Sequence, residues 1–245
     1  MKFSRVISFV GLLAGLVVVV PAAPCAAPTR TVSLRTDDGV TLTGTFYEAP
    51  RRPAPAVILL HMLTRTRDDW QAFGNRIADA GIHALAIDFR GHGGSSGSLV
   101  NADGQPDLSR LVLDVQAARA FLTARSDLVQ AQAIGIAGAS IGANVAILAA
   151  ANDPLVKSLA LLSAGLDYRS LRTGASMQRY GARPALLIAG SNDPYAQRSL
   201  RDLGVLGGGL RETRTLDNAG HGTMMLSHDP DLGRALVDWF QRTLL

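Results

Sequence analysis

Residues 133–151 read AIGIAGASIGANVAILAAA, and this stretch decides the fold. Its first five residues are apolar on both faces, as expected of a strand buried in a parallel sheet. Residues 138–142 then form the pattern Gly-x-Ser-x-Gly around Ser140, and the apolar residues 141–151 continue as a helix. A buried strand that turns directly into a helix is the repeating unit of an α/β protein.

Further apolar runs on both sides of this stretch alternate with helical ones. We expect strands at residues 31–35, 41–48, 56–60, 82–87, 133–137, 158–162, 184–189 and 210–216. We expect helices at residues 68–80, 108–125, 141–151, 195–203 and 231–245. The turn Asp37-Asp38-Gly39 joins the first two strands and predicts an antiparallel opening. The remaining alternation predicts an α/β fold with a mostly parallel sheet and helices on both faces.

The segment 164–183 between two late strands reads as a loop with one helical turn, which leaves no room for a cap domain. No internal repeat or linker divides the chain, so we expect one domain over residues 28–245. The composition, with 47% hydrophobic and 18% charged residues, is typical of a single globular domain with a sizeable core.

Residues 1–27 have the layout of a secretory signal peptide: Lys2 and Arg5, the apolar run 6–20, and a tail of small residues. The run holds about 15 residues, whereas a bilayer span needs roughly 20. We therefore expect export to the periplasm or the medium and no membrane span after cleavage. The only cysteine, Cys25, lies in the tail, so the mature domain has no internal disulfide; lipidation of Cys25 is the alternative to simple cleavage.

The net charge of the chain indicates what it does not bind. Removal of residues 1–27 takes away Lys2 and Arg5 and no acidic residue, which lowers the formal charge from +4 to +2. The remaining arginines are scattered along the chain, so we expect no nucleic-acid partner.

Ser140 is the candidate nucleophile. In a sharp strand-to-helix turn the central serine projects its hydroxyl, and glycines two residues away on each side allow neighbouring backbone to pass closely. The helix N-terminus also places free N–H groups beside any developing negative charge. The alternative is a serine that merely caps the helix in a glycine-rich turn.

A serine hydroxyl needs a base to remove its proton, and His221 is our candidate for that base. It follows the last predicted strand and lies between Gly220 and Gly222. By contrast, His83 begins an apolar strand and is expected to be packed in the core, and His228 sits where it could help to begin the last helix.

Asp193 is the candidate acid that orients the histidine. It follows the predicted strand 184–189 and gives the chain order serine, acid, histidine. The alternative for this residue is an Asn-Asp-Pro turn that starts a helix. Asp167, which follows the preceding strand, is the rival acid.

The backbone amides of Leu63 and Ile141 are the candidate oxyanion donors, with Met62 as the alternative to Leu63. We expect His61 to fix this loop by hydrogen bonds. The glycine-rich stretch 88–97 lacks the lysine of a phosphate-binding loop and reads as a structural turn. No His/Cys cluster or acidic cage is recognisable, so we expect no metal and no cofactor.

Together these motifs resemble the α/β-hydrolase superfamily, in its small, lidless dienelactone-hydrolase-like branch. The residues that carry the resemblance are 60–63, 88–95, 138–142, 190–193 and 220–221. The resemblance implies an eight-stranded, mostly parallel sheet without a substantial cap. Ser140 stands where dienelactone hydrolases carry cysteine, which favours ordinary carboxylic esters over dienelactones.

We therefore expect an exported serine hydrolase, a carboxylesterase that acts through Ser140, His221 and Asp193 and an acyl-enzyme intermediate. Its partner would be a small-molecule ester, and an open site favours short or bulky polar esters. An exported peptidase or amidase would use the same residues, and a catalytically silent binding protein would share only the fold. The sequence leaves the oligomeric state open.

Overall fold

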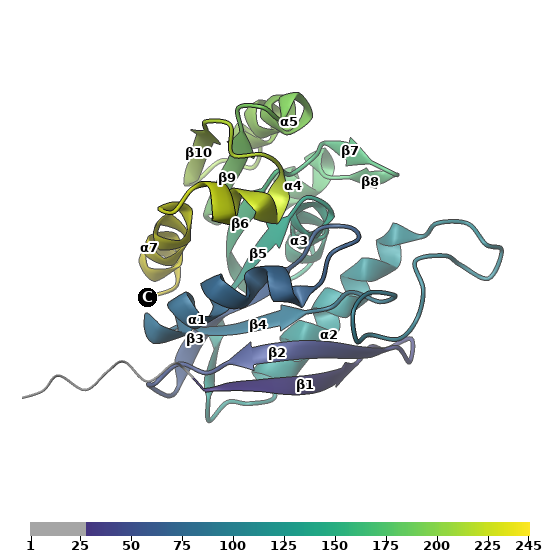
Figure 1. Cartoon of the computed structure of the whole chain (residues 1–245), viewed down its shortest axis with the longest axis vertical. Helices are drawn as coiled ribbons and strands as arrows, with labels where there is room; N and C mark the ends of the chain where they lie inside the picture. Colours follow the sequence, from purple (N-terminus) through teal and green to yellow (C-terminus); the bar gives the residue numbers. More distant parts are fainter. Residues whose placement is uncertain (1–27) are drawn as a thin grey trace, which may run out of the picture.

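The computed structural model describes residues 28–245, so the signal peptide expected at residues 1–27, including Cys25, lies outside the described residues. The described chain forms an eight-stranded sheet in the order β1-β2-β4-β3-β5-β6-β9-β10, with helices packed against it (Figure 1). Its strands are β1 (Thr29–Arg35), β2 (Thr41–Tyr47), β3 (Ala54–Leu60), β4 (His83–Ile87), β5 (Val129–Ala139), β6 (Val156–Leu162), β9 (Ala185–Gly190) and β10 (Arg211–Leu216).

Helices follow most of the strands. The α-helices are α1 (Gln71–Asp79), α2 (Leu111–Thr123), α3 (Ile141–Ala151), α4 (Gly174–Tyr180), α5 (Pro194–Gly204), α6 (Met225–His228) and α7 (Leu232–Leu244). Short 3-10 helices are η1 (Arg67–Trp70), η2 (Leu108–Arg110) and η3 (Gly222–Met224). Each of the helices α1 to α5 lies between two strands of the parallel part of the sheet. Parallel strands need crossover connections of this kind.

The strand directions confirm the predicted α/β fold. Strand β2 runs antiparallel to both β1 and β4, and the pairs from β4 through β10 are parallel. Strands β3, β4 and β9 are buried along their whole length, as their apolar sequences predict. Strand β10 forms where expected, but its sequence RETRTL is polar and partly exposed because it is the edge strand and pairs with β9 alone.

The sheet has a packed core on each face. On one face, Phe73, Ile77 and the aromatic rings of Trp70, Trp239 and Phe240 bring α1 and α7 together over β3, β4 and β6. On the other face the core is formed by apolar side chains of α2, α3, α4 and α5. The predicted cover of helices on both faces is therefore confirmed.

The segment 164–183 is more regular than the loop we expected. It forms a hairpin of β7 (Asp167–Tyr168) and β8 (Leu171–Arg172), followed by α4, and no cap domain is present in the described chain (Figure 1). The Gly165 amide donates to Asn144 Oδ1 of α3 at 2.8 Å, and Thr173 Oγ1 donates to the Gly165 carbonyl at 2.7 Å. The two buried contacts hold the ends of the hairpin together and join them to α3, and the contact to Asn144, 21 residues away, is not revealed by local sequence.

A buried ion cluster joins the glycine-rich turn to α2. The Arg90 side chain is fully buried and donates from Nη2 to Asp114 Oδ1 at 2.7 Å and from Nη1 to Asp38 Oδ2 at 2.7 Å. The neighbouring Asp88 carboxylate accepts from the amides of Arg67 at 2.8 Å and Gly94 at 2.9 Å. These contacts fit the structural role expected for residues 88–97.

The ion cluster gives a prediction about stability. Replacing Asp114 with alanine leaves the buried Arg90 guanidinium without one of its two carboxylates, which should destabilise the fold by about 3 kcal/mol. Urea unfolding followed by circular dichroism measures the change. Asp231→Ala, which breaks the exposed pair with Arg234, should leave the urea midpoint unchanged. Equal midpoints for Asp114→Ala and the unmodified protein would contradict the role given to the cluster.

Candidate active site

Ser140 occupies a strained turn between β5 and α3. Its backbone has φ 53° and ψ −115°, in the left-handed region that serine rarely adopts. A Cβ at Gly138 would collide with the Gly142 carbonyl, and a Cβ at Gly142 would lie 2.5 Å from the Leu60 carbonyl oxygen. The two glycines of the motif therefore allow the backbone to pass closely enough to form the turn.

The structure brings Ser140, His221 and Asp193 together, although 81 residues separate the first from the second. His221 Nε2 lies 2.8 Å from Ser140 Oγ, and His221 Nδ1 lies 2.6 Å from Asp193 Oδ2. A carboxylate only accepts, so Nδ1 carries the proton and Nε2 is free to accept from the serine hydroxyl. The His221 side chain is 43% exposed and that of Asp193 is 13% exposed, so the imidazole is open to solvent and its orienting acid is shielded.

Asp193 has two contacts at once. Its Oδ2 accepts from His221 Nδ1, and its Oδ1 accepts from the Ala196 amide at 3.2 Å. The second contact caps the N-terminus of α5. The two sequence interpretations of Asp193, helix start and orienting acid, are thus compatible in one side chain. The rival Asp167 is exposed, and its Oδ2 lies 3.3 Å from Arg172 Nε in the β7–β8 hairpin.

The loop that carries His221 is fixed by side chains from two neighbouring loops. The Gly220 amide donates to Asn192 Oδ1 at 3.0 Å, and the Gly222 amide donates to Ser163 Oγ at 3.0 Å. Sequence reasoning missed Ser163 and Asn192 as supports. Their partners lie 59 and 28 residues away, so no local pattern could have identified them.

The candidate oxyanion donors are Ile141 at the start of α3 and Leu63, or Met62, in the loop after β3. Because Gly142 packs against the carbonyls of Leu60 and His61, the segment 61–63 runs beside the turn of Ser140. Among residues 28–245, no hydrogen bond is formed by the amides of Met62, Leu63 or Ile141. All three N–H groups therefore have no partner among the described residues, and Met62 remains the alternative to Leu63.

His61 is a fully buried support of this loop. Its Nδ1 donates to the Met62 carbonyl at 2.7 Å, and its Nε2 accepts from the Phe89 amide at 3.0 Å. Burial is the main cause that lowers the pKa of His61 to about 4. The imidazole is therefore neutral near pH 7, with both nitrogens engaged.

The other histidines lie elsewhere. His83 accepts from the Ala49 amide at 2.9 Å within the core, and His228 lies 2.8 Å from the Met224 carbonyl on the surface. His92 belongs to the glycine-rich turn, where its Nδ1 lies 3.1 Å from the Arg90 carbonyl. None of these three contacts Ser140 in the described chain.

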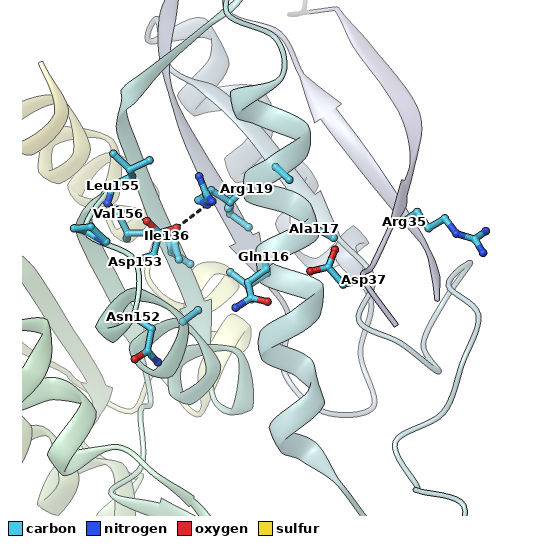
Figure 2. Close-up of a pocket in the computed structure, with 15 residues that line it drawn as sticks. Arg35, Asp37, Gln116, Ala117, Arg119, Ile136, Asn152, Asp153, Leu155 and Val156 are labelled. Carbon is cyan, nitrogen blue, oxygen red and sulfur yellow. Dashed lines mark hydrogen bonds and ion pairs between the residues drawn. The ribbon is translucent and has the colours of Figure 1, made fainter. Parts of the chain in front are cut away.

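A cavity of about 560 Å³ lies apart from these residues, between α2 and the end of α3 (Figure 2). Arg119 reaches from α2 to pair with Asp153 at 2.6 Å along its wall. Ser140, Asp193 and His221 do not line it. The reactive geometry, and not the cavity, therefore locates the candidate site.

Residues 28–245 contain neither a cluster of metal-ligating side chains nor a helix long enough to span a membrane. No three His, Cys, Asp or Glu side chains in this range are grouped so that they could hold a metal ion. No helix within it has the length and apolar character needed to cross a bilayer.

The sequence profile of the family described as serine aminopeptidase, S33, matches residues 51–183, more than half of the chain. The chain belongs to the serine aminopeptidase S33 family. The resemblance to the α/β-hydrolase superfamily is thereby confirmed. The matched range contains Ser140 and ends before Asp193 and His221. No curated protein sequence matches this hydrolase.

Solved structures share the fold of this hydrolase at low sequence identity. An esterase of Pyrococcus furiosus is 19% identical, with a TM-score of 0.69 over 89% of this chain and 92% of that one. A dienelactone hydrolase of Anabaena variabilis is 19% identical, with a TM-score of 0.71 over 90% and 100%. The esterase domain of a Rhodothermus marinus protein is 19% identical, with a TM-score of 0.70 over 89% and 100%.

The buried His61 predicts a dependence of stability on pH. An unfolded histidine has a pKa of about 6.5, so acidification below that value protonates the unfolded chain first and reduces stability until the pKa of the folded state is reached. Between pH 6 and pH 4.5, the stability of His61→Gln should therefore fall less steeply than that of the unmodified protein, by up to about 1.4 kcal/mol per pH unit. Urea unfolding at a series of pH values measures both slopes, and parallel curves would contradict the assignment.

Proposed function

We propose that this protein is a serine hydrolase that cleaves carboxylic esters through Ser140, His221 and Asp193. The observation that supports this most strongly is the continuous hydrogen-bonded path from Ser140 Oγ through the imidazole to Asp193 Oδ2, with distances of 2.8 and 2.6 Å. A helix-capping serine would not require an oriented base at its hydroxyl. The strained backbone of Ser140 is a cost that a purely structural serine does not explain.

In the proposed first step, Ser140 Oγ bonds to the ester carbonyl carbon as its proton passes to His221 Nε2. The electron pair of the C=O bond moves to the oxygen, and the resulting imidazolium is stabilised by the Asp193 carboxylate. When the tetrahedral intermediate collapses, the C–O bond to the alcohol breaks and Nε2 returns the proton to the leaving alkoxide. Water then gives a proton to the same nitrogen as its oxygen bonds to the acyl carbon. When this second intermediate collapses, the bond from carbon to Ser140 Oγ breaks, Nε2 returns the proton to Oγ, and the acid is released.

The oxyanion of each tetrahedral intermediate would accept from the amides of Leu63 and Ile141. Both amides are free of other partners in the described chain, and Ile141 is the first residue of α3, where the positive end of the helix dipole adds to the effect. The fixed position of the 61–63 segment, held by His61, means that little reorganisation is needed when charge develops.

We propose an exported enzyme, released by cleavage near residue 27, that acts on short or bulky polar esters. The segment between β6 and α4 contains only the two-residue strands β7 and β8, which supports an open site. Aminopeptidase activity is the second candidate, because the family carries that description. Peptide substrates would use the same three side chains and differ in the leaving group.

Ser140→Ala tests the nucleophile. The unmodified protein should hydrolyse nitrophenyl esters, fastest with short acyl chains, and should react with a fluorophosphonate probe. The variant should lose the probe reaction and about 10³-fold or more of the ester turnover, because no oxygen remains to attack. Aminoacyl anilides measured beside the esters decide between the two candidate functions. Full labelling of Ser140→Ala by the fluorophosphonate probe would contradict the proposal.

Asp193→Asn tests the orienting acid without removing the helix cap, because asparagine is also a good N-cap residue. The amide no longer fixes the tautomer with Nδ1 protonated, so kcat should fall by about 10⁴-fold at an unchanged urea midpoint. Asp107→Asn is the matched control, since Asp107 Oδ1 accepts from the Ser109 amide at the start of η2. Equal activities for these two variants would contradict the role of Asp193.

A further inference from the structure

Asp69 lies between the two loops that the proposed mechanism requires. It belongs to η1, which directly follows the loop containing Leu63, and its carboxylate faces the loop of His221. Thr223 is two residues beyond His221, and its Oγ1 donates to Asp69 Oδ2 at 2.6 Å. This hydrogen bond joins segments 154 residues apart in the chain.

The carboxylate also has a partner on the first loop. Arg65 donates to it in the two-pronged geometry, from Nε at 3.0 Å to each oxygen and from Nη2 at 2.6 Å to Oδ1. Burial acts against ionisation of Asp69, but the hydrogen bonds from Arg65 and Thr223 hold its pKa below the ordinary value. Thr223 therefore donates to a charged oxygen, which gives a stronger bond than a neutral acceptor would.

Asp69 is held in place by its surroundings, so it can fix the position of Thr223. Its side chain is only 9% exposed, and the next residue, Trp70, is fully buried in the core. At the other end of η1, the Arg67 amide donates to the buried Asp88 at 2.8 Å. Movement of Asp69 would therefore disturb two anchored neighbours, and its partner Thr223 is itself buried in η3, directly after His221.

We infer that the hydrogen bond from Thr223 to Asp69 positions the His221 loop against the Leu63 loop, so that base and oxyanion donor meet one substrate together. The inference rests on the function proposed above. The tetrahedral intermediate needs the imidazole on its leaving-group side and the amide on its oxygen at the same moment. Thr223 and Asp69 are positioning residues in this account, because neither touches the reacting atoms.

The effect should be on turnover and not on binding. A misplacement of about 1 Å between reacting groups can cost 100-fold in rate. Loss of the Thr223 hydroxyl should therefore lower kcat by about 10- to 100-fold while KM changes by less than about twofold. The fluorophosphonate labelling rate should fall with kcat, because phosphonylation uses the same base and the same amides.

The test compares Thr223→Val, which keeps the shape and loses the hydroxyl, with Thr223→Ser, which keeps the hydroxyl. Thr223→Ser should stay within about twofold of the unmodified kcat, because the bond to Asp69 can still form. Thr243→Val is the matched control: Thr243 lies on α7, away from the site, and its Oγ1 is 2.8 Å from Ser158 Oγ of β6. Its kcat should equal that of the unmodified protein.

A double-mutant cycle assigns the effect to the contact itself. Asp69→Ala removes the acceptor, and the double variant with Thr223→Val should be no slower than the slower single variant. If Thr223→Val does not fold, as judged by circular dichroism, Asp69→Ala provides the same comparison of kcat with KM. Additive losses, a loss confined to KM, or equal loss in Thr223→Ser would overturn the inference. If the unmodified protein shows no Ser140-dependent labelling, the proposed function itself fails, which is a distinct result.

Discussion

The hydrogen bond between Ser140 Oγ and His221 Nε2 depends on the strained backbone of Ser140 and on the contacts that hold the His221 loop. It requires a serine in the left-handed region, which costs on the order of 1–3 kcal/mol and must be offset by the surrounding fold. The close approach of Gly138 and Gly142 to neighbouring backbone makes that turn possible. The imidazole must then reach the hydroxyl from the loop after the edge strand β10, which the buried side chains of Ala219 and Met225 anchor in the core on either side of His221.

That loop is also held by polar contacts with three neighbouring segments. Asn192 binds the Gly220 amide, Ser163 binds the Gly222 amide, and Asp69 binds Thr223. Each contact comes from a loop at the carboxyl ends of the parallel strands, where ligand sites in such sheets gather. The buried strands are thus a rigid base for short loops whose side chains fix one another.

The sequence predicted the sheet and indicated the position of the candidate site, because strong local patterns mark both. Apolar runs predicted the buried strands, and the pattern Gly-x-Ser-x-Gly between a strand and a helix identified Ser140 as the candidate nucleophile. The patterns failed for the elements whose structure is determined by contacts between residues far apart in the sequence. The β7–β8 hairpin depends on Asn144 and Thr173, and the polar strand β10 is stabilised by its pairing with β9. Asp69 and Thr223 carry no motif, since their relation exists only in the folded chain.

The central claim is that Ser140, His221 and the amides of Leu63 and Ile141 form one catalytic arrangement. A crystal structure of the protein after reaction with a fluorophosphonate tests it directly. The account predicts phosphorus bonded to Ser140 Oγ, with the phosphonyl oxygen accepting from both amides and His221 still paired with Asp193. Phosphorus on another residue, or a phosphonyl oxygen turned away from both amides, would contradict it.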